Sequence, residues 1–312
     1  MPQAATLDAD ATAAVLPFAP LMEAIAEVVQ EVEAGRVTVP ERAAHPLPGG
    51  GRLLLMPAAD SRLLVVKVVT VMPENRERGL PTIQGDFLVK DVRTGAALLT
   101  LDAATVTNRR TAALTLLGAR AVGVTAAASV LLIGAGPQAR AHAEAFMEVL
   151  GVQRFLVASR RPGSAEKLAA ELRAAGVDAS RAPAVRAAVH DVDLVLAATT
   201  SAMPVVPDEV PDGVFVAAVG AFRRGMAELP AALLRRREVV VDTMEGARTE
   251  AGDLIAAAEA GAWEWAGAVS LASLLAPDAP APTRPRLFKS VGHAAFDLAA
   301  ARVAVRQGGS PD

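Results

Sequence analysis

From residue 131 to about residue 241, the chain alternates short apolar runs with helical patterns. The apolar runs are VLLI, FLVA, LVLAA, VFVAAV and VVVD. Short apolar runs separated by amphipathic helices are typical of parallel strands joined by crossover helices. The first helix has apolar residues at Ala143, Phe146, Met147 and Leu150, which form one stripe, and Gly151 can end it. This pattern predicts an α/β domain with a doubly wound parallel sheet.

The two ends of the chain follow a different pattern. The N-terminal part contains a helical segment, LMEAIAEVVQEVEAG, and two apolar runs, RLLLMP and RLLVVKVVTV. A second helix is predicted for RTAALTLLGARA, with Thr107 or Asn108 as its N-cap. After a proline-rich stretch, APDAPAPTRPR, the segment LFKSVGHAAFDLAAARVAV returns to strand and helix. We therefore predict a parallel-sheet domain over residues 121–284, inserted in a discontinuous α+β domain formed by residues 1–120 and 285–312.

Composition narrows the class of protein. The chain has 312 residues, enough for two domains, and a net charge of -3, which gives no electrostatic footprint for nucleic acid or an anionic membrane. It has no cysteine, which excludes disulfides, thiolate metal sites and a cysteine nucleophile. The N-terminus lacks the basic region of a secretory signal, and no apolar stretch approaches the roughly 20 residues that span a bilayer. We expect a cytoplasmic protein that binds neither nucleic acid nor membranes.

The turn after the first apolar run has the sequence GAGPQA. In such a turn Gly134 permits the tight bend, Gly136 lets the backbone approach a pyrophosphate, and Ala139 allows close packing of strand and helix. Pro137 and Gln138 would begin the helix whose N-terminus faces the phosphates. A purely structural turn is the alternative. Because a strand precedes the motif and an amphipathic helix follows it, we predict a Rossmann domain that binds a dinucleotide.

The end of the second strand distinguishes NAD from NADP. A carboxylate there binds the ribose 2′-hydroxyl, whereas basic and hydroxyl side chains suit a 2′-phosphate. Here Ser159, Arg160 and Arg161 occupy that position, which favours NADPH, with NADH as a weaker possibility, although two solvated arginines are the alternative. Thr199 and Thr200 end the strand LVLAA at the carboxyl edge of the sheet, where ligands of such folds bind. We predict that these five residues line the cofactor site.

Three basic residues of the N-terminal part are candidates for an anion site. Arg42 precedes HPLPGGG, Lys67 lies among valines, and Arg110 is near the expected start of a helix. Burying an unpaired ammonium costs several kcal/mol, so Lys67 requires an anionic ligand or a carboxylate nearby. A helix N-terminus beside Arg110 would also favour a carboxylate. The alternative for each residue is a surface or ion-paired base.

The chain resembles the ornithine cyclodeaminase/mu-crystallin family over nearly its whole length. The resemblance rests on LLLMPA, VVKVVTVMPENRERGLPTIQG, TGAALLTLDAATVTNRRTAALT, VLLIGAGPQARAH, EAGDL and FKSVGHAAFDLAAA. It implies a Rossmann domain inserted in a substrate-binding and dimerisation domain, and a homodimer. It also implies that Arg42, Lys67 and Arg110 bind a substrate carboxylate, and that Asn75 lies in a substrate-site loop.

Two departures from the family pattern indicate the reaction. Ornithine cyclodeaminases have a glutamate two residues before the MP pair and an aspartate shortly after the VG pair, where this chain has Leu54 and Phe222. Two apolar side chains cannot supply the acid–base groups that cyclodeamination requires. The resemblance is therefore to the imine-reductase members, with Leu54 and Phe222 facing an apolar substrate ring.

The implied reaction is NADPH-dependent reduction of a cyclic ketimine, Δ1-pyrroline-2-carboxylate or Δ1-piperideine-2-carboxylate, to L-proline or L-pipecolate. Lys67 and Arg110 are the candidate catalytic residues, with a proton from solvent or Lys67. An alanine-type amino-acid dehydrogenase, an ornithine cyclodeaminase and a mu-crystallin-like protein that binds NADPH or another ligand are the alternatives. The four histidines lack metal-ligand spacing, so no metal is expected.

Overall fold

The structure is a computed structural model that describes residues 4–279 and 284–308. The chain divides into two compact units, one formed by residues up to 110 and from 294 on, the other by residues 111–293. The sequence-based boundaries were 120 and 284. Residues 285–293 belong instead to the second unit, because Arg286–Lys289 is a strand inside its sheet. Residues 280–283 of the proline-rich stretch lie outside the described residues.

The first unit contains a six-stranded sheet in the order β1-β6-β5-β4-β3-β2. Neighbouring strands are antiparallel except for β1 and β6. The strands are β1 (Ala5–Thr6), β2 (Ala43–Pro46), β3 (Arg52–Ala59), β4 (Leu63–Val71), β5 (Ile83–Asp91) and β6 (Ala97–Asp102). The helices are α1 (Ala9–Ala14), α2 (Phe18–Glu33) and α11 (Ala294–Gln307), with 3₁₀ turns at Pro48–Gly50 and Pro73–Arg76. The expected helix of the N-terminal part is thus confirmed as α2, and its two apolar runs form β3 and β4.

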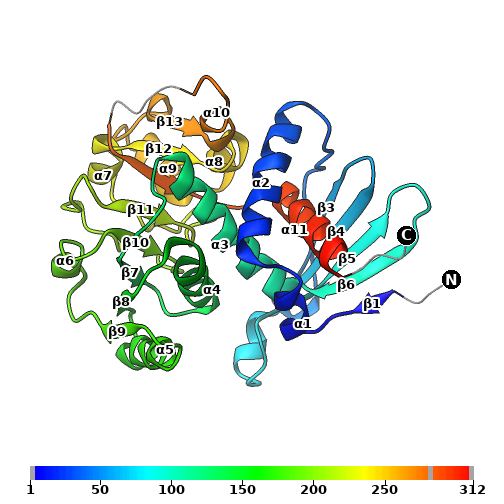
Figure 1. Cartoon of the computed structure of the whole chain (residues 1–312), viewed down its shortest axis with the longest axis horizontal. Coiled ribbons are helices and arrows are strands. Elements are labelled where there is room, and N and C mark those ends of the chain that lie inside the picture. Colours follow the sequence, from blue (N-terminus) through cyan, green and yellow to red (C-terminus); the bar gives the residue numbers. More distant parts are fainter. Residues whose placement is uncertain (1–3, 280–283, 309–312) are drawn as a thin grey trace. The chain divides into compact units, whose positions relative to one another are not determined.

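The two faces of this sheet differ in what covers them. Helix α11 packs on β3 and β4, and α2 packs on α11 (Figure 1). Side chains alternate between the faces of a strand, and on β4 the residues facing the helices, such as Val65 and Lys67, are buried whereas Val66 and Val68 are half-buried. The opposite face is mainly apolar, and among the described elements of this unit none covers it. We call it the open face; it includes Leu53, Leu55, Leu64, Val66, Val68 and Leu88.

The second unit contains an eight-stranded parallel sheet in the order β13-β12-β14-β11-β10-β7-β8-β9. Its strands are β7 (Ser129–Ile133), β8 (Arg154–Ala158), β9 (Asp178–Arg181), β10 (Leu194–Ala197), β11 (Phe215–Ala218), β12 (Glu238–Val241), β13 (Ala268–Ser270) and β14 (Arg286–Lys289). From β7 the chain runs outward to β8 and β9, then returns to add β10 on the other side. The switch point between β7 and β10 is where ligands bind in open α/β sheets.

Helices connect these strands and cover the sheet. They are α4 (Pro137–Ala145), α5 (Pro162–Ala174), α6 (Val185–Ala188), α7 (Ala231–Arg236), α8 (Met244–Glu250), α9 (Gly252–Glu259) and α10 (Leu271–Leu274), with a π-helical turn at Phe146–Leu150 and a 3₁₀ turn at Trp265–Gly267. Gly151, with φ 72°, ends the helix after the GAGPQA turn, as its position predicted. None of the described helices is long and apolar enough to cross a membrane.

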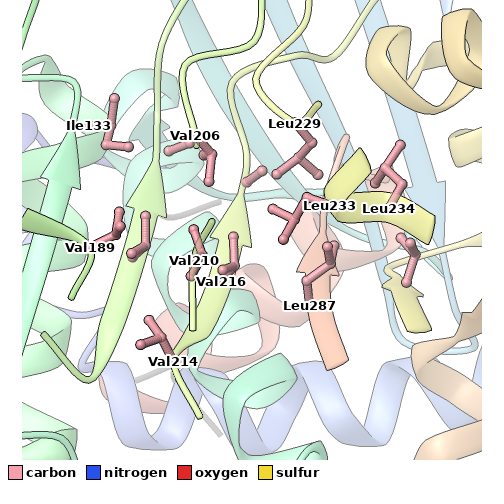
Figure 2. Close-up of a cluster of buried hydrophobic side chains, with 14 of the residues drawn as sticks. Ile133, Val189, Val206, Val210, Val214, Val216, Leu229, Leu233, Leu234 and Leu287 are labelled. Carbon is pink, nitrogen blue, oxygen red and sulfur yellow. The ribbon is translucent and has the colours of Figure 1, made fainter. Parts of the chain in front are cut away.

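Small aliphatic side chains fill the interior of the second unit. Figure 2 shows Ile133, Val216 and Leu287 of three strands together with Val206 and Leu233 from the covering segments. All five of these residues are buried. Because these strands are covered on both faces, nearly every position carries an apolar side chain, and the sequence shows each strand as a continuous apolar run. The five strands predicted from those runs are confirmed as β7, β8, β10, β11 and β12.

One helix crosses the boundary between the units and begins earlier than the sequence suggested. It is α3 (Ala103–Ala121), and Asp102 accepts a hydrogen bond from the Thr105 N–H at 2.7 Å. The proposed N-caps, Thr107 and Asn108, therefore lie inside the helix, where the Thr107 hydroxyl donates to the Ala103 carbonyl. Aspartate is one of the preferred N-cap residues, and with Asp102 in that role the helix begins directly after it, in the segment TLDAAT.

Candidate functional site

Cross-strand register brings two of the candidate basic residues into one row. Lys67 on β4 lies opposite Met56 on β3 and Phe87 on β5. Arg42 directly precedes β2, whose first residue, Ala43, pairs with Leu55, the neighbour of Met56; its charge is one of those that lower the pKa of Lys67. Side chains directly opposite one another point to the same face of a sheet. The row therefore extends from the exposed Arg42 at the sheet edge to the buried Lys67 beneath α11.

Asp297 joins Lys67 to Arg110. Its Oδ2 lies 2.8 Å from Lys67 Nζ and its Oδ1 lies 3.2 Å from Arg110 Nε. The side chains of Lys67 and Asp297 are 5% and 1% exposed. Asp297 stands on α11, Lys67 on β4 and Arg110 on α3, so three elements meet at one carboxylate within the first unit. We call these three residues the Lys67–Asp297–Arg110 cluster.

The charges of this site leave an excess of positive potential. Burial is the main cause that lowers the pKa of Lys67, Asp297 opposes it, and the charges of Arg110 and Arg42 lower it further. Asp297 carries one negative charge and contacts two buried cations, Lys67 and Arg110. A second negative charge would balance the other cation, which suits a ligand with one carboxylate. The anion that Lys67 was expected to need is thus the side chain of Asp297. Because Asp297 also contacts Arg110, one positive charge of the cluster remains for a ligand.

The expectation that Arg110 lies near the N-terminus of a helix was wrong. Because α3 begins at Ala103, Arg110 lies well inside the helix, away from the unpaired N–H groups of its first turn. The helix dipole, which acts within the first turn, does not assist anion binding there. Arg110 is nevertheless buried, and its guanidinium is oriented by Asp297. Its geometry comes from a side-chain partner rather than from the helix terminus.

Asn75, Leu54 and Phe222 lie in different surroundings. Asn75 is buried and its amide donates to the Pro81 carbonyl at 2.9 Å, so it closes the loop between β4 and β5. Leu54 pairs with Val69 across the sheet and shares the face of Lys67. Phe222 belongs to the second unit, where it follows β11 and is 42% exposed. The side chains at 54 and 222 can contact apolar groups but can neither donate nor accept a proton.

The GAGPQA turn has the geometry that a dinucleotide requires. Gly134 has φ +123°, and a Cβ there would lie 2.3 Å from the Ala198 carbonyl oxygen, so glycine is needed for both conformation and space. Gly136 is the N-cap of α4, and a Cβ on it would meet no atom within 4 Å. Space beside the first N–H groups of a helix next to the switch point suits a pyrophosphate. The residues present therefore fit a dinucleotide.

His142 supports the helix that follows this turn. It is fully buried, and burial lowers its pKa to about 4. Its Nδ1 lies 2.8 Å from the Gln138 carbonyl and its Nε2 lies 2.9 Å from the Thr115 hydroxyl. A neutral ring that donates from Nδ1 and accepts at Nε2 satisfies both contacts. His142 thus braces α4 against α3.

The residues after β8 and β10 are also placed at the carboxyl edge of the sheet. The Ser159 hydroxyl donates to the Arg161 carbonyl at 2.6 Å, and both Arg160 and Arg161 are exposed. Thr199 donates to Glu228 Oε1 through its N–H at 2.6 Å and through its hydroxyl at 2.9 Å, whereas Thr200 is exposed. Thr199 therefore binds a buried carboxylate, and Thr200 is the threonine available to a ligand.

Known proteins resemble this chain along its whole length. The sequence profile of the ornithine cyclodeaminase/mu-crystallin family matches residues 6–307. Δ1-Pyrroline-2-carboxylate reductase 2 of Burkholderia ambifaria is 43% identical, over 95% of this chain and 94% of the relative. A Δ1-pyrroline-2-carboxylate/Δ1-piperideine-2-carboxylate reductase of Azospirillum brasilense is 42% identical over the same shares.

A solved structure shows the same fold. It is Δ1-pyrroline-2-carboxylate reductase of Thermococcus litoralis in complex with NADH and L-proline, with a TM-score of 0.88, 29% identity and 97% of each chain covered. Profile, sequence identity and fold agree over both units described above. The chain is a member of the ornithine cyclodeaminase/mu-crystallin family.

Proposed function

We propose that this protein is an NAD(P)H-dependent oxidoreductase that reduces the C=N bond of a cyclic ketimine carrying a carboxylate. The substrates are Δ1-pyrroline-2-carboxylate and Δ1-piperideine-2-carboxylate, and the products L-proline and L-pipecolate. The main support is the buried Lys67–Asp297–Arg110 cluster, which retains positive charge for one carboxylate. The relatives at 42–43% identity are named for reductases of these substrates.

The protein groups perform two tasks in this reaction. Arg110 and Lys67 bind the substrate carboxylate, and Arg42 adds positive charge at the edge of the same row. A reduced nicotinamide, when bound, supplies a hydride equivalent for the imine carbon. Protonation of the imine nitrogen makes that carbon more electrophilic, and the proton comes from solvent or from Lys67. Because the pKa of Lys67 is lowered, its ammonium is a stronger acid than an ordinary lysine.

The decisive experiment measures oxidation of NADPH and NADH with the five- and six-membered imines. We expect turnover with both rings, and slower or no turnover with pyruvate plus ammonia, which an alanine-type dehydrogenase would use. Release of ammonia from L-ornithine would instead indicate a cyclodeaminase. The apolar residues Leu54 and Phe222 argue against that outcome, because neither can act on the ornithine amines. Absence of activity with both imines would contradict the proposal.

We further propose that NADPH is preferred over NADH. Ser159, Arg160 and Arg161 form the loop after β8, and the loop contains no carboxylate that would bind a ribose 2′-hydroxyl. The variant Arg160→Ala/Arg161→Ala should raise the KM for NADPH roughly tenfold or more, since a charge-assisted hydrogen bond contributes about 1.5–3 kcal/mol. The KM for NADH should change little. Arg181→Ala, which removes an exposed arginine of β9, is the control, and equal weakening of both cofactors would contradict the assignment.

The open face of the first sheet supports a homodimer. Its half-buried leucines and valines form a contiguous apolar surface that the described part of this unit leaves uncovered, and such surfaces mark association sites. We expect light scattering to give twice the mass of one chain for the wild-type protein. Val66→Lys, in the centre of this face, should yield monomers, whereas Val92→Lys, at an exposed valine outside the strands, should not. A wild-type monomer, or a dimer that tolerates Val66→Lys, would contradict this interface.

A further inference from the structure

Three ionisable side chains lie in the interior of the second unit. They are Glu228 in the segment before α7, Asp253 on α9 and Lys289 at the end of β14, and all are at most 3% exposed. Lys289 Nζ lies 3.4 Å from Asp253 Oδ2, and the Glu228 N–H donates to the same oxygen at 3.3 Å. Buried charges are costly and persist when they have partners and a role. None of the three belongs to the carboxylate site of the first unit.

The carboxylate of Glu228 connects the ends of two strands. Its Oε1 accepts the N–H and the hydroxyl of Thr199 after β10, and its Oε2 accepts the N–H groups of Gly220, at 2.6 Å, and Ala221, at 3.2 Å, after β11. All four partners are donors, so an ionised carboxylate, which only accepts, satisfies every one of them. A glutamine would direct an NH₂ group toward one pair of donors.

The backbone at this connection is packed as closely as glycine allows. A Cβ on Gly220 would lie 2.1 Å from the Thr199 carbonyl oxygen and 2.4 Å from Glu228 Oε1. A Cβ on Gly252, at the start of α9, would lie 2.3 Å from the Arg223 carbonyl oxygen. The segment from Gly220 to Glu228 is therefore held by the carboxylate on one side and by α9 on the other.

Lys289 provides the charge that opposes protonation of this carboxylate. Burial raises the pKa of Glu228, and the Lys289 ammonium is the largest of the influences that lower it. Asp253 contacts both residues, because its Oδ2 binds Lys289 and the Glu228 backbone N–H. Without Lys289, Glu228 would take up a proton at a higher pH and lose part of its donor set.

We propose that Glu228 is a positioning residue, which holds the segments after β10 and β11 in the arrangement that receives the nicotinamide end of the cofactor, with the buried ammonium of Lys289 as a nearby counter-charge. The proposal rests on the proposed function for the identity of the cofactor. Thr200 and Phe222 continue from the two connected segments and are both exposed. In open α/β sheets, ligands bind at the carboxyl ends of strands beside the switch point, which here includes β10. Glu228 itself is buried and acts through these segments.

Hydrogen exchange of the cofactor-free protein tests the positioning directly. In Glu228→Gln, we expect the amides of Thr199, Gly220 and Ala221 to exchange faster, while those of β7 stay protected. The Kd for NADPH should rise about tenfold, in line with the loss of charge-assisted hydrogen bonds. Glu238→Gln is the matched control, because it removes another partly buried carboxylate of the same sheet, the partner of Arg286, and should alter neither measurement.

The pH dependence separates positioning from a general loss of stability. In Lys289→Met, the protection factors of the same amides, which correct exchange for its intrinsic pH dependence, should fall and the Kd for NADPH should rise as the pH is lowered, both more steeply than in the wild type. Lys289→Met also provides a test of the proposal if Glu228→Gln does not fold. Unchanged exchange and unchanged Kd in Glu228→Gln, or a Lys289→Met variant with the wild-type pH dependence, would overturn the proposal. Neither measurement uses an imine, so failure of the proposed substrate would leave this test intact.

Discussion

Replacing Arg110 by alanine is expected to lower kcat/KM for the cyclic imines by roughly 10²- to 10³-fold, since truncation of a buried charge that binds a carboxylate costs about 3 to 4 kcal/mol. The chain should still fold, because Asp297 retains Lys67 as a partner at 2.8 Å. Arg110→Lys should recover only part of the activity, because an ammonium lacks the planar pair of donors that matches a carboxylate. Steady-state kinetics with both imines measure these effects.

The neighbouring arginine offers a matched control. Arg109 donates from Nε to the Leu16 carbonyl at 2.7 Å, and its guanidinium lies 3.8 Å from the centre of the Phe18 ring. It therefore packs α3 against the segment before α2, and Arg109→Ala should lower the melting temperature with little change in kcat/KM. An Arg110→Ala variant with wild-type kcat/KM, or an equal kinetic loss in both variants, would contradict the role of Arg110 in binding the substrate.

The parallel sheet could be predicted because its physical causes are local. Buried strands appear as apolar runs, and the φ +123° of Gly134 requires a glycine. The position of β14 could not be obtained in this way. Its sequence, RLFK, has charged residues at both ends, and it enters the sheet between β11 and β12 although it follows β13 in the chain. Long-range insertion leaves no periodic signal, so the boundary expected at 284 fell before a strand of the second unit.

The candidate site could be predicted in part. Lys67 was notable because a lysine among valines needs an anion, but the sequence did not identify Asp297 as that anion. A usable signal was present, since Asp297 is an acid in the otherwise apolar stretch AAFDLAAA. Pairing two such isolated charges, which are 230 residues apart, requires knowledge that α11 packs on β4. The separation arises because the second unit interrupts the first.

Replacing Asp297 by asparagine is expected to destabilise the protein by about 3 to 5 kcal/mol, because it leaves two buried cations without their shared anion. Asp297 is also the main influence that raises the pKa of Lys67. In the variant that pKa falls further, so Lys67 loses its proton as the pH rises, and kcat/KM for the imines should fall with it. Urea denaturation and kinetics, each measured as a function of pH, test the two effects.

The two measurements should change in opposite directions. Where the pKa of Lys67 is lower in the folded than in the unfolded chain, the unfolded chain binds more protons, so the stability of Asp297→Asn should increase with pH while kcat/KM decreases. Adding Lys67→Met should restore part of the stability but not the activity, because it removes one unpaired cation together with a substrate ligand. Glu31→Gln, which breaks the more exposed ion pair with Arg302 on α11, should cost at most about 1 kcal/mol. If Asp297→Asn had the wild-type stability and pH profile, Asp297 would not organise the two cations, and the carboxylate site would have to be held by other groups.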